Sequence, residues 1–279
     1  MIANSINPEP IRIGISTRAL FNLEEEHSVF LNKGVHAYAK LQLERENTII
    51  RKGAGFEVIN RLLSLNENRN HHLVEVILLS QNSPDLSLRA FNSIQKYGLS
   101  IRMGSFTSGR SLAPFIPAWD VDLFLSNEAS DVQAAVLAGT AAAKLGSFPE
   151  TSLETQEDEV RIAFDGDAVV FSPESDEIYK ESGLQAFLAH EQENATKPMA
   201  GGPFGNFLKK LSILRNIYMN QNGVSKVRIA IVTARNAPAH ARVIHTLRTW
   251  GDSRRRSSFR RTTRKSAYTK GVRSAHLFR

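Results

Sequence analysis

The chain has 279 residues, enough for one large or two modest domains with hydrophobic cores. Its 42% hydrophobic and 23% charged residues are ordinary for a globular protein. The absence of cysteine excludes disulfides and thiolate catalysis. No apolar stretch reaches the about 18 residues that suggest a membrane span, and the polar first ten residues do not resemble a secretory signal. We expect a cytoplasmic protein without a membrane partner.

The net charge of +7 is unevenly distributed along the chain. Residues 252–279 hold ten Lys or Arg and one acid, whereas the other 251 residues hold 25 basic and 27 acidic residues. A strongly basic chain usually indicates an anionic partner such as nucleic acid. Here that signal comes only from the tail, so nucleic acid is expected to bind at most non-specifically. The tail shows no strand pattern and no amphipathic period, which predicts disorder.

Short apolar segments alternate with helical patterns along the rest of the chain. Each expected strand is brief, rich in β-branched or large apolar residues and followed by a polar turn; these strands cover residues 11–15, 74–79, 121–125, 160–164 and 227–232. Apolar residues at helical spacing predict helices within residues 58–63, 88–94, 132–143 and 239–250. The alternation predicts an α/β fold of Rossmann-like parallel sheets flanked by helices.

The second half of the chain repeats the pattern of the first at an offset near 150 residues. RIGISTRALF, from Arg12, is similar to RIAFDGDAVVF, from Arg161, and EVILLSQNSP, from Glu75, is similar to RIAIVTARNAP, from Arg228. This collinear match favours two related units, although any two strand–helix units share some likeness. We expect an N-terminal α/β unit at 10–150, a related but incomplete catalytic unit at 158–251 and a basic tail at 252–279, with a polar linker near 146–159.

Asp165-Gly166-Asp167 follows an apolar strand and precedes another apolar run. Residues two apart in an extended chain point the same way, so both carboxylates can face one ligand. Two close carboxylates favour a divalent cation or a shared proton between them. One can act as a nucleophile toward phosphorus, and the other can transfer protons. A plain Asp-Gly-Asp surface turn is the alternative, but its apolar flanks favour a functional site.

Thr233-Ala234-Arg235 follows the strand at residues 227–232 and precedes a helix. A hydroxyl, a guanidinium and the N–H groups of a helix start can bind one phosphate together. Simple capping of the helix is the alternative explanation.

Taken together, these motifs resemble those of the haloacid-dehalogenase-like phosphatases, and more specifically the cytosolic type I 5′-nucleotidases. FDGDAV is similar to their first motif and VTAR to their second, and the likeness covers about residues 10–251. The resemblance implies that Asp165 is the nucleophile, that Asp167 is the general acid and base, and that Thr233, Ala234 and Arg235 bind phosphate. It also implies Mg²⁺ at Asp165 and Asp167 and a nucleoside 5′-monophosphate substrate.

The segment after Gly251 departs from the family pattern. The third-motif lysine and the fourth-motif acidic pair belong there, but the tail offers Lys265, Lys270 and Asp252 in no matching context. We therefore expect impaired hydrolysis, and we hypothesise a reading-frame error near Gly251. A one-base shift can be written that reads as a strand, a lysine, a helix and a strand followed by an acid.

Two further interpretations remain open. The chain could be a non-catalytic nucleotide- or nucleic-acid-binding protein, or an unstable fragment. Ser16, Thr17 and Arg18 occupy the first unit's counterpart of Asp165-Gly166-Asp167. They cannot supply a carboxylate nucleophile, but they could contact substrate across the two units.

Overall fold

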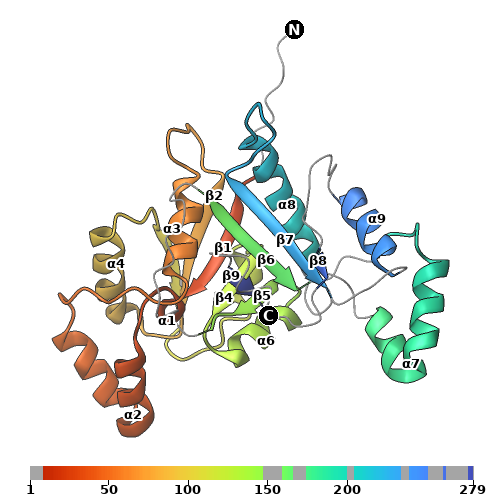
Figure 1. The fold of residues 1–279 in the computed structure, drawn as a ribbon. Coiled ribbons are helices and arrows are strands. Elements are labelled where there is room, and N and C mark those ends of the chain that lie inside the picture. Colours follow the sequence, from red (N-terminus) through yellow and green to blue (C-terminus); the bar gives the residue numbers. More distant parts are fainter. Residues whose placement is uncertain are drawn as a thin grey trace. The chain divides into compact units, whose positions relative to one another are not determined.

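The computed structural model describes residues 9–146, 159–165, 174–199, 204–233, 239–250, 260–261 and 276–278. The chain divides into two compact units, Met1–Ser152 and Leu153–Arg279. Parallel strands and helices build both units (Figure 1), which confirms the predicted α/β fold class.

The first unit contains a five-stranded parallel sheet with strand order β3-β2-β1-β4-β5. Its strands are β1 (Ile11–Ser16), β2 (Val74–Ser80), β3 (Met103–Phe106), β4 (Leu123–Ser126) and β5 (Ala141–Lys144). Its helices are α1 (Thr17–Leu20), α2 (Glu24–Glu44), α3 (Phe56–Ser64), the 3₁₀ turn η1 (Pro84–Leu86), α4 (Ser87–Lys96), α5 (Phe115–Ala118) and α6 (Ala129–Leu137). The strand order reverses between β1 and β4, and ligands bind at such a reversal point in open α/β sheets.

The second unit contains a four-stranded parallel sheet with strand order β8-β7-β6-β9. Its strands are β6 (Val160–Asp165), β7 (Val227–Thr233), β8 (Arg260–Arg261) and β9 (His276–Phe278). Its described helices are α7 (Glu174–Glu193), α8 (Phe204–Ile217) and α9 (His240–Trp250). The long central pair, β6 and β7, lies side by side in Figure 1.

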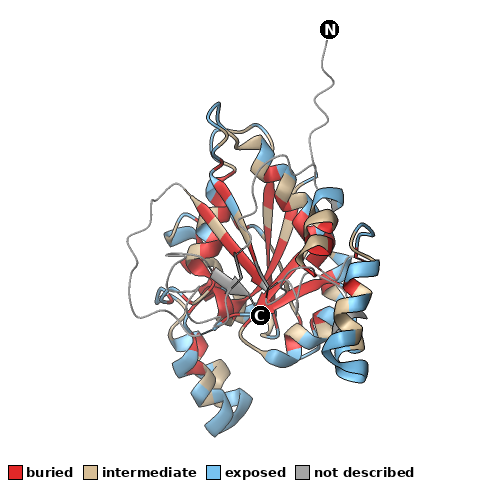
Figure 2. Ribbon diagram, turned by 45° about the vertical axis from the view of Figure 1, so that its right-hand side comes forward, coloured by how far each residue is buried: buried red, intermediate tan, exposed pale blue. Residues whose placement is uncertain are grey.

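The strands form the core of each unit, as the buried strands in Figure 2 show. Ile13, Ile15 and Ile77 are fully buried in the first unit, and Phe164 is fully buried in the second. Near-continuous apolar strands suit a parallel sheet covered on both faces. Burying each such side chain contributes about 1.5–3 kcal/mol to folding.

Strand pairing follows the same register in the two units, in agreement with the predicted duplication. β6 corresponds to β1, β7 to β2, β8 to β3 and β9 to β4, each at a constant sequence offset within the strand, although the offset differs from strand to strand. The corresponding pairs are Ile11–Val74 and Val160–Val227, Ser80–Phe106 and Thr233–Arg261, and Ile13–Leu123 and Ile162–His276.

Two predicted elements were wrong. The tail contains β8 and β9, although its sequence predicted no strand. Each pairs with an outer edge of the β6–β7 pair. The N–H and C=O groups of such an edge form hydrogen bonds with another strand whatever its side-chain pattern. The helix expected within residues 132–143 ends at Leu137, and Ala141–Lys144 form β5. Gly139 has a φ of 83°, and this left-handed turn stops the helix.

A bend in one long helix recurs in both units. Gly34 lies in the middle of α2 with φ 78° and ψ −179°, and Gly183 lies in the middle of α7 with φ 77° and ψ −174°. Only glycine adopts this region without strain. Each glycine therefore fixes a bend between two helical segments, and Figure 1 shows both helices as bent pairs.

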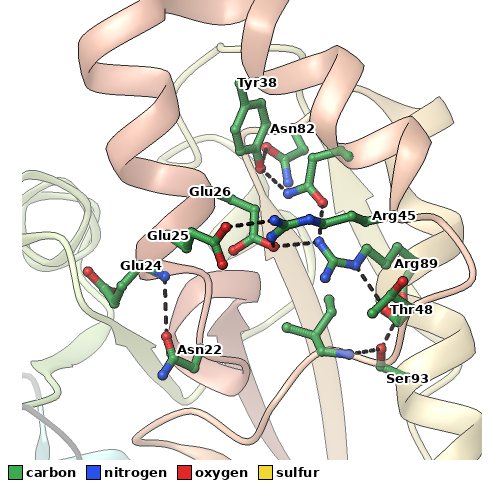
Figure 3. Close-up of polar contacts among 12 residues, drawn as sticks. Asn22, Glu24, Glu25, Glu26, Tyr38, Arg45, Thr48, Asn82, Arg89 and Ser93 are labelled. Atoms are coloured by element: carbon green, nitrogen blue, oxygen red, sulfur yellow. Dashed lines mark hydrogen bonds and ion pairs between the residues drawn. The ribbon is translucent and has the colours of Figure 1, made fainter.

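A buried arginine fastens the bent helix of the first unit to α4 (Figure 3). The Nη1 group of Arg89 donates to Glu26 at 2.7 Å and to Gln42 at 2.9 Å, and its Nε donates to the Thr48 carbonyl at 3.0 Å. Ser93 Oγ accepts from the Ile50 N–H at 3.0 Å. The cluster joins both segments of α2 and the loop after it to one face of α4.

Arg242 forms a corresponding cluster in the second unit. Its Nη1 group donates to Glu191 at 3.0 Å, and its Nε donates to the Lys197 carbonyl at 3.2 Å. Thr246 Oγ1 accepts from the Met199 N–H at 2.9 Å, as Ser93 does from Ile50. The repeated sequence pattern therefore includes a repeated hydrogen-bond network.

Candidate active site

The two predicted phosphatase motifs end neighbouring strands of the second unit. Asp165 is the last residue of β6, and its Cα partner on β7 is Val232. Thr233 follows Val232 directly and is the last residue of β7. The backbone therefore brings Asp165 and Thr233 to the same carboxyl edge, where parallel α/β sheets bind their ligands.

Aromatic packing supports the end of β6. Phe164 is fully buried, and its ring meets Phe204 at 5.8 Å and Phe207 at 6.0 Å between centroids, both in edge-on contacts. Such contacts add about 0.5–1.5 kcal/mol beyond area burial. The strand is therefore held against α8 immediately before Asp165.

Several predicted site residues lie outside the described part of the chain. They are Asp167, Ala234 and Arg235, together with Asp252, Lys265 and Lys270 of the tail. Within the described ranges, no group of three or more His, Cys, Asp or Glu could hold a metal ion. The assigned roles of Asp165, Asp167, Thr233, Ala234 and Arg235 therefore stay predictions.

Ser16, Thr17 and Arg18 lie at the carboxyl edge of the first sheet, which corresponds to the edge of the second sheet that holds Asp165 and Thr233. Ser16 ends β1, and its Oγ accepts from the Ala19 N–H at 3.2 Å. Thr17 is only 5% exposed, and its Oγ1 has no hydrogen-bond partner among the described residues. Register makes Ser16 the counterpart of Asp165 and Ser80 the counterpart of Thr233. Substrate contact by Ser16, Thr17 and Arg18 across the two units stays a prediction.

These three residues line a pocket of about 540 Å³ in the first unit. The sequence interpretation missed the rest of its lining, which includes His27, Phe30, Tyr38, Ser80, Asn82 and Asp131. The repeat contained a usable signal for Ser80, because it aligns with Thr233. Nothing local marked the α2 residues, which come from both sides of the bend at Gly34.

Ion pairs and burial set the electrostatics of this pocket. Arg18 forms ion pairs with Glu24, at 2.7 Å, and with Glu128. The hydrogen bond to Glu24 raises the pKa of Arg18, against the opposing effect of burial. Burial raises the pKa of Asp131, although hydrogen bonds from Gln81 and Ser126 oppose it. Both Glu128 and Asp131 line the pocket.

The α/β fold and the residues at the ends of β6 and β7 fit the haloacid-dehalogenase-like class of proteins. Residues 3–278 match the family described as 5′-nucleotidase. The chain belongs to this family, and the match extends beyond Gly251, further than the expected 10–251.

A human relative, named cytosolic 5′-nucleotidase 1B, is 33% identical to this chain over 258 residues. The match covers 88% of the chain and 42% of that protein. The chain therefore spans less than half the length of this curated relative. No solved structure matches the chain. Among the described helices, none is both long and apolar enough to cross a membrane.

Proposed function

We propose that this protein hydrolyses nucleoside 5′-monophosphates to nucleoside and phosphate in the cytoplasm. The observation that carries the proposal is the backbone pairing that brings Asp165 and Thr233 to adjacent strand ends in a 5′-nucleotidase family chain. The name of the human relative supports the same substrate class.

The proposed reaction has two steps. A carboxylate oxygen of Asp165 attacks phosphorus, and the bond from phosphorus to the 5′ oxygen breaks while Asp167 gives that oxygen a proton. Asp167 then takes a proton from water, which attacks the aspartyl-phosphate and releases inorganic phosphate and Asp165. Thr233 holds the phosphoryl oxygens through its hydroxyl, with Ala234 and Arg235 as further anion donors.

The residue types at this edge fit Mg²⁺. An Asp at a strand end and a second Asp two residues on offer oxygen ligands, which Mg²⁺ prefers. Asp165 and the backbone carbonyl of Asp167 would hold the ion. When bound, it neutralises charge on the phosphoryl group.

We also propose that hydrolysis by this chain is impaired. A phosphoryl-transfer site depends on charge-neutralising groups around the transferred phosphate. Residues 252–279 lack the lysine and acid contexts of the third and fourth family motifs. Sequencing the coding DNA tests the proposed reading-frame error, and a shifted frame that is closed or unlike the family contradicts it.

The activity test measures phosphate released from AMP with Mg²⁺ and with EDTA. We expect slow, Mg²⁺-dependent release that Asp165→Asn abolishes and that Ser64→Ala, a change of an exposed hydroxyl away from both sites, leaves unchanged. A frame-corrected chain should be at least about 100-fold faster, the usual effect of restoring a transition-state stabilising group.

Equal turnover of the two chains contradicts the impairment. Release that survives Asp165→Asn contradicts the nucleophile assignment. Binding of AMP without release by either chain favours the non-catalytic alternative.

A further inference from the structure

The pocket in the first unit has two chemically different walls. Hydroxyl and amide groups at the carboxyl ends of β1 and β2 form one wall, with Ser16, Thr17, Ser80 and Asn82. Side chains of α2 form the other, with His27, Phe30, Val35 and Tyr38. A volume of about 540 Å³ lies within the usual range of small-molecule sites, about 300–1,000 Å³. The pocket therefore suits a ligand with one polar and one flat apolar part.

The polar wall contains a donor that the described protein leaves unsatisfied. Thr17 is 95% buried, yet its Oγ1 has no partner among the described residues. A buried hydroxyl without a hydrogen bond is unfavourable, so such groups usually have a partner. Because Thr17 lines the pocket, a ligand hydroxyl or ring nitrogen can be that partner.

The α2 wall presents aromatic rings. His27 and Phe30 are stacked at 6.2 Å between centroids, and Tyr38 meets Phe30 edge-on at 5.9 Å. Phe30 remains 43% exposed, so its ring is available to a flat ligand. Tyr38 is fixed by bonds to Asn82 at 3.0 Å and Gln42 at 2.8 Å. Rings of this kind bind nucleobases by stacking.

The charges at the pocket disfavour a phosphate group. Arg18, the lining arginine, already pairs with Glu24 and Glu128. Glu128 and Asp131 add carboxylates to the lining. A phosphate dianion there would meet like charge, whereas an uncharged ligand would not.

We propose that the first unit binds a nucleoside in this pocket, with the base against Phe30 and the sugar hydroxyls at Thr17 and Ser80. The site is non-hydrolytic, because Ser16 stands where the second unit has Asp165. The proposal uses residues of the first unit alone, so it does not rest on the proposed hydrolysis.

The test is isothermal titration of the full chain with adenosine, AMP and inorganic phosphate. We expect adenosine to bind more tightly than AMP, and Phe30→Ala to weaken adenosine binding by about tenfold through lost stacking. Thr17→Val should also weaken binding without lowering the melting temperature of the free protein, because it removes an unpartnered hydroxyl. Leu31→Ala is the matched control, since Leu31 is 68% exposed and does not line the pocket.

Three outcomes overturn the proposal. Adenosine does not bind, or its affinity is the same in Phe30→Ala, Thr17→Val and the unchanged chain. Adenosine binding is lost in Thr233→Val but kept in Phe30→Ala, which places it in the second unit. AMP or phosphate binds more tightly than adenosine, and Phe30→Ala weakens that binding.

Discussion

Each unit buries an arginine at the corresponding position of its fold. The carboxylate that pairs with this arginine comes from a different segment of the bent helix in each unit. In the first unit Arg89 pairs with Glu26, before the bend in α2, while Gln42, after the bend, supplies a neutral acceptor. In the second unit Arg242 pairs with Glu191 on the second segment of α7, the register counterpart of Gln42. All four charged side chains are at most 7% exposed.

This difference shows what the shared framework requires. A buried guanidinium needs one carboxylate and enough acceptors, but the carboxylate can come from either segment of the bent helix. The strand ends differ more consequentially: Asp165 and Thr233 in the second unit correspond to Ser16 and Ser80 in the first. Similar scaffolds thus carry a proposed reaction site in one unit and a proposed binding site in the other.

The largest effect is expected from moving the carboxylate of the first unit. Glu26→Gln leaves Arg89 buried without a carboxylate and should lower the free energy of unfolding by about 3–5 kcal/mol. Adding Gln42→Glu recreates the arrangement of the second unit and should restore much of that loss. Urea unfolding followed by circular dichroism measures both variants. A double variant no more stable than Glu26→Gln would show that the two positions are not interchangeable.

The bends give the next largest effect. Gly34→Ala and Gly183→Ala each place a Cβ where φ is near +78°, which should destabilise the affected unit by about 1–3 kcal/mol. The space around both glycines is open, so the effect comes from backbone strain and not from a clash. Gly146→Ala is the control, since its Cβ also meets open space without a positive φ. Thermal unfolding that is equal in all three variants would contradict the strain.

Smaller effects are expected at the paired helix hydroxyls. Ser93→Ala and Thr246→Val leave the buried N–H of Ile50 or Met199 without its acceptor. Each should cost about 1–2 kcal/mol, because an unpaired buried donor keeps its desolvation penalty. Urea unfolding of Ser64→Ala, an exposed hydroxyl, provides the baseline. Unequal losses at Ser93 and Thr246 would show that the two networks differ in strength.

The smallest effect concerns pH in the first unit. Burial raises the pKa of Asp131 above its unfolded value, so between these two values the folded state binds more protons. The stability that the Asp131 carboxyl contributes is fully present below its pKa in the unfolded chain, about 4. It is lost as pH rises through the higher pKa of the folded state. Asp131→Asn should remove that loss, so its free energy of unfolding should fall less with rising pH than that of the unchanged chain. Parallel slopes in a urea series across pH would contradict this.

Local patterns in the sequence predicted much of the fold. The apolar segments now seen as β1, β2, β4, β6 and β7 were identifiable because a buried parallel strand is a short run of large apolar residues. The same patterns placed Asp165 and Thr233 at strand ends, and the repeat aligned Ser80 with Thr233. The strand at Ala141–Lys144 was not predicted, because a short alanine-rich run suits a helix as well as a strand.

The sequence by itself determined the α/β class and the family, and it predicted the repeated pattern of strands and helices, because these depend on the order and spacing of residues along the chain. Only the tertiary structure decided that Glu26 neutralises Arg89, that residues 260–261 and 276–278 pair with sheet edges, and that Thr17 and Phe30 share a pocket. Those facts depend on packing between distant segments, and local spacing does not specify which distant group fills a buried position.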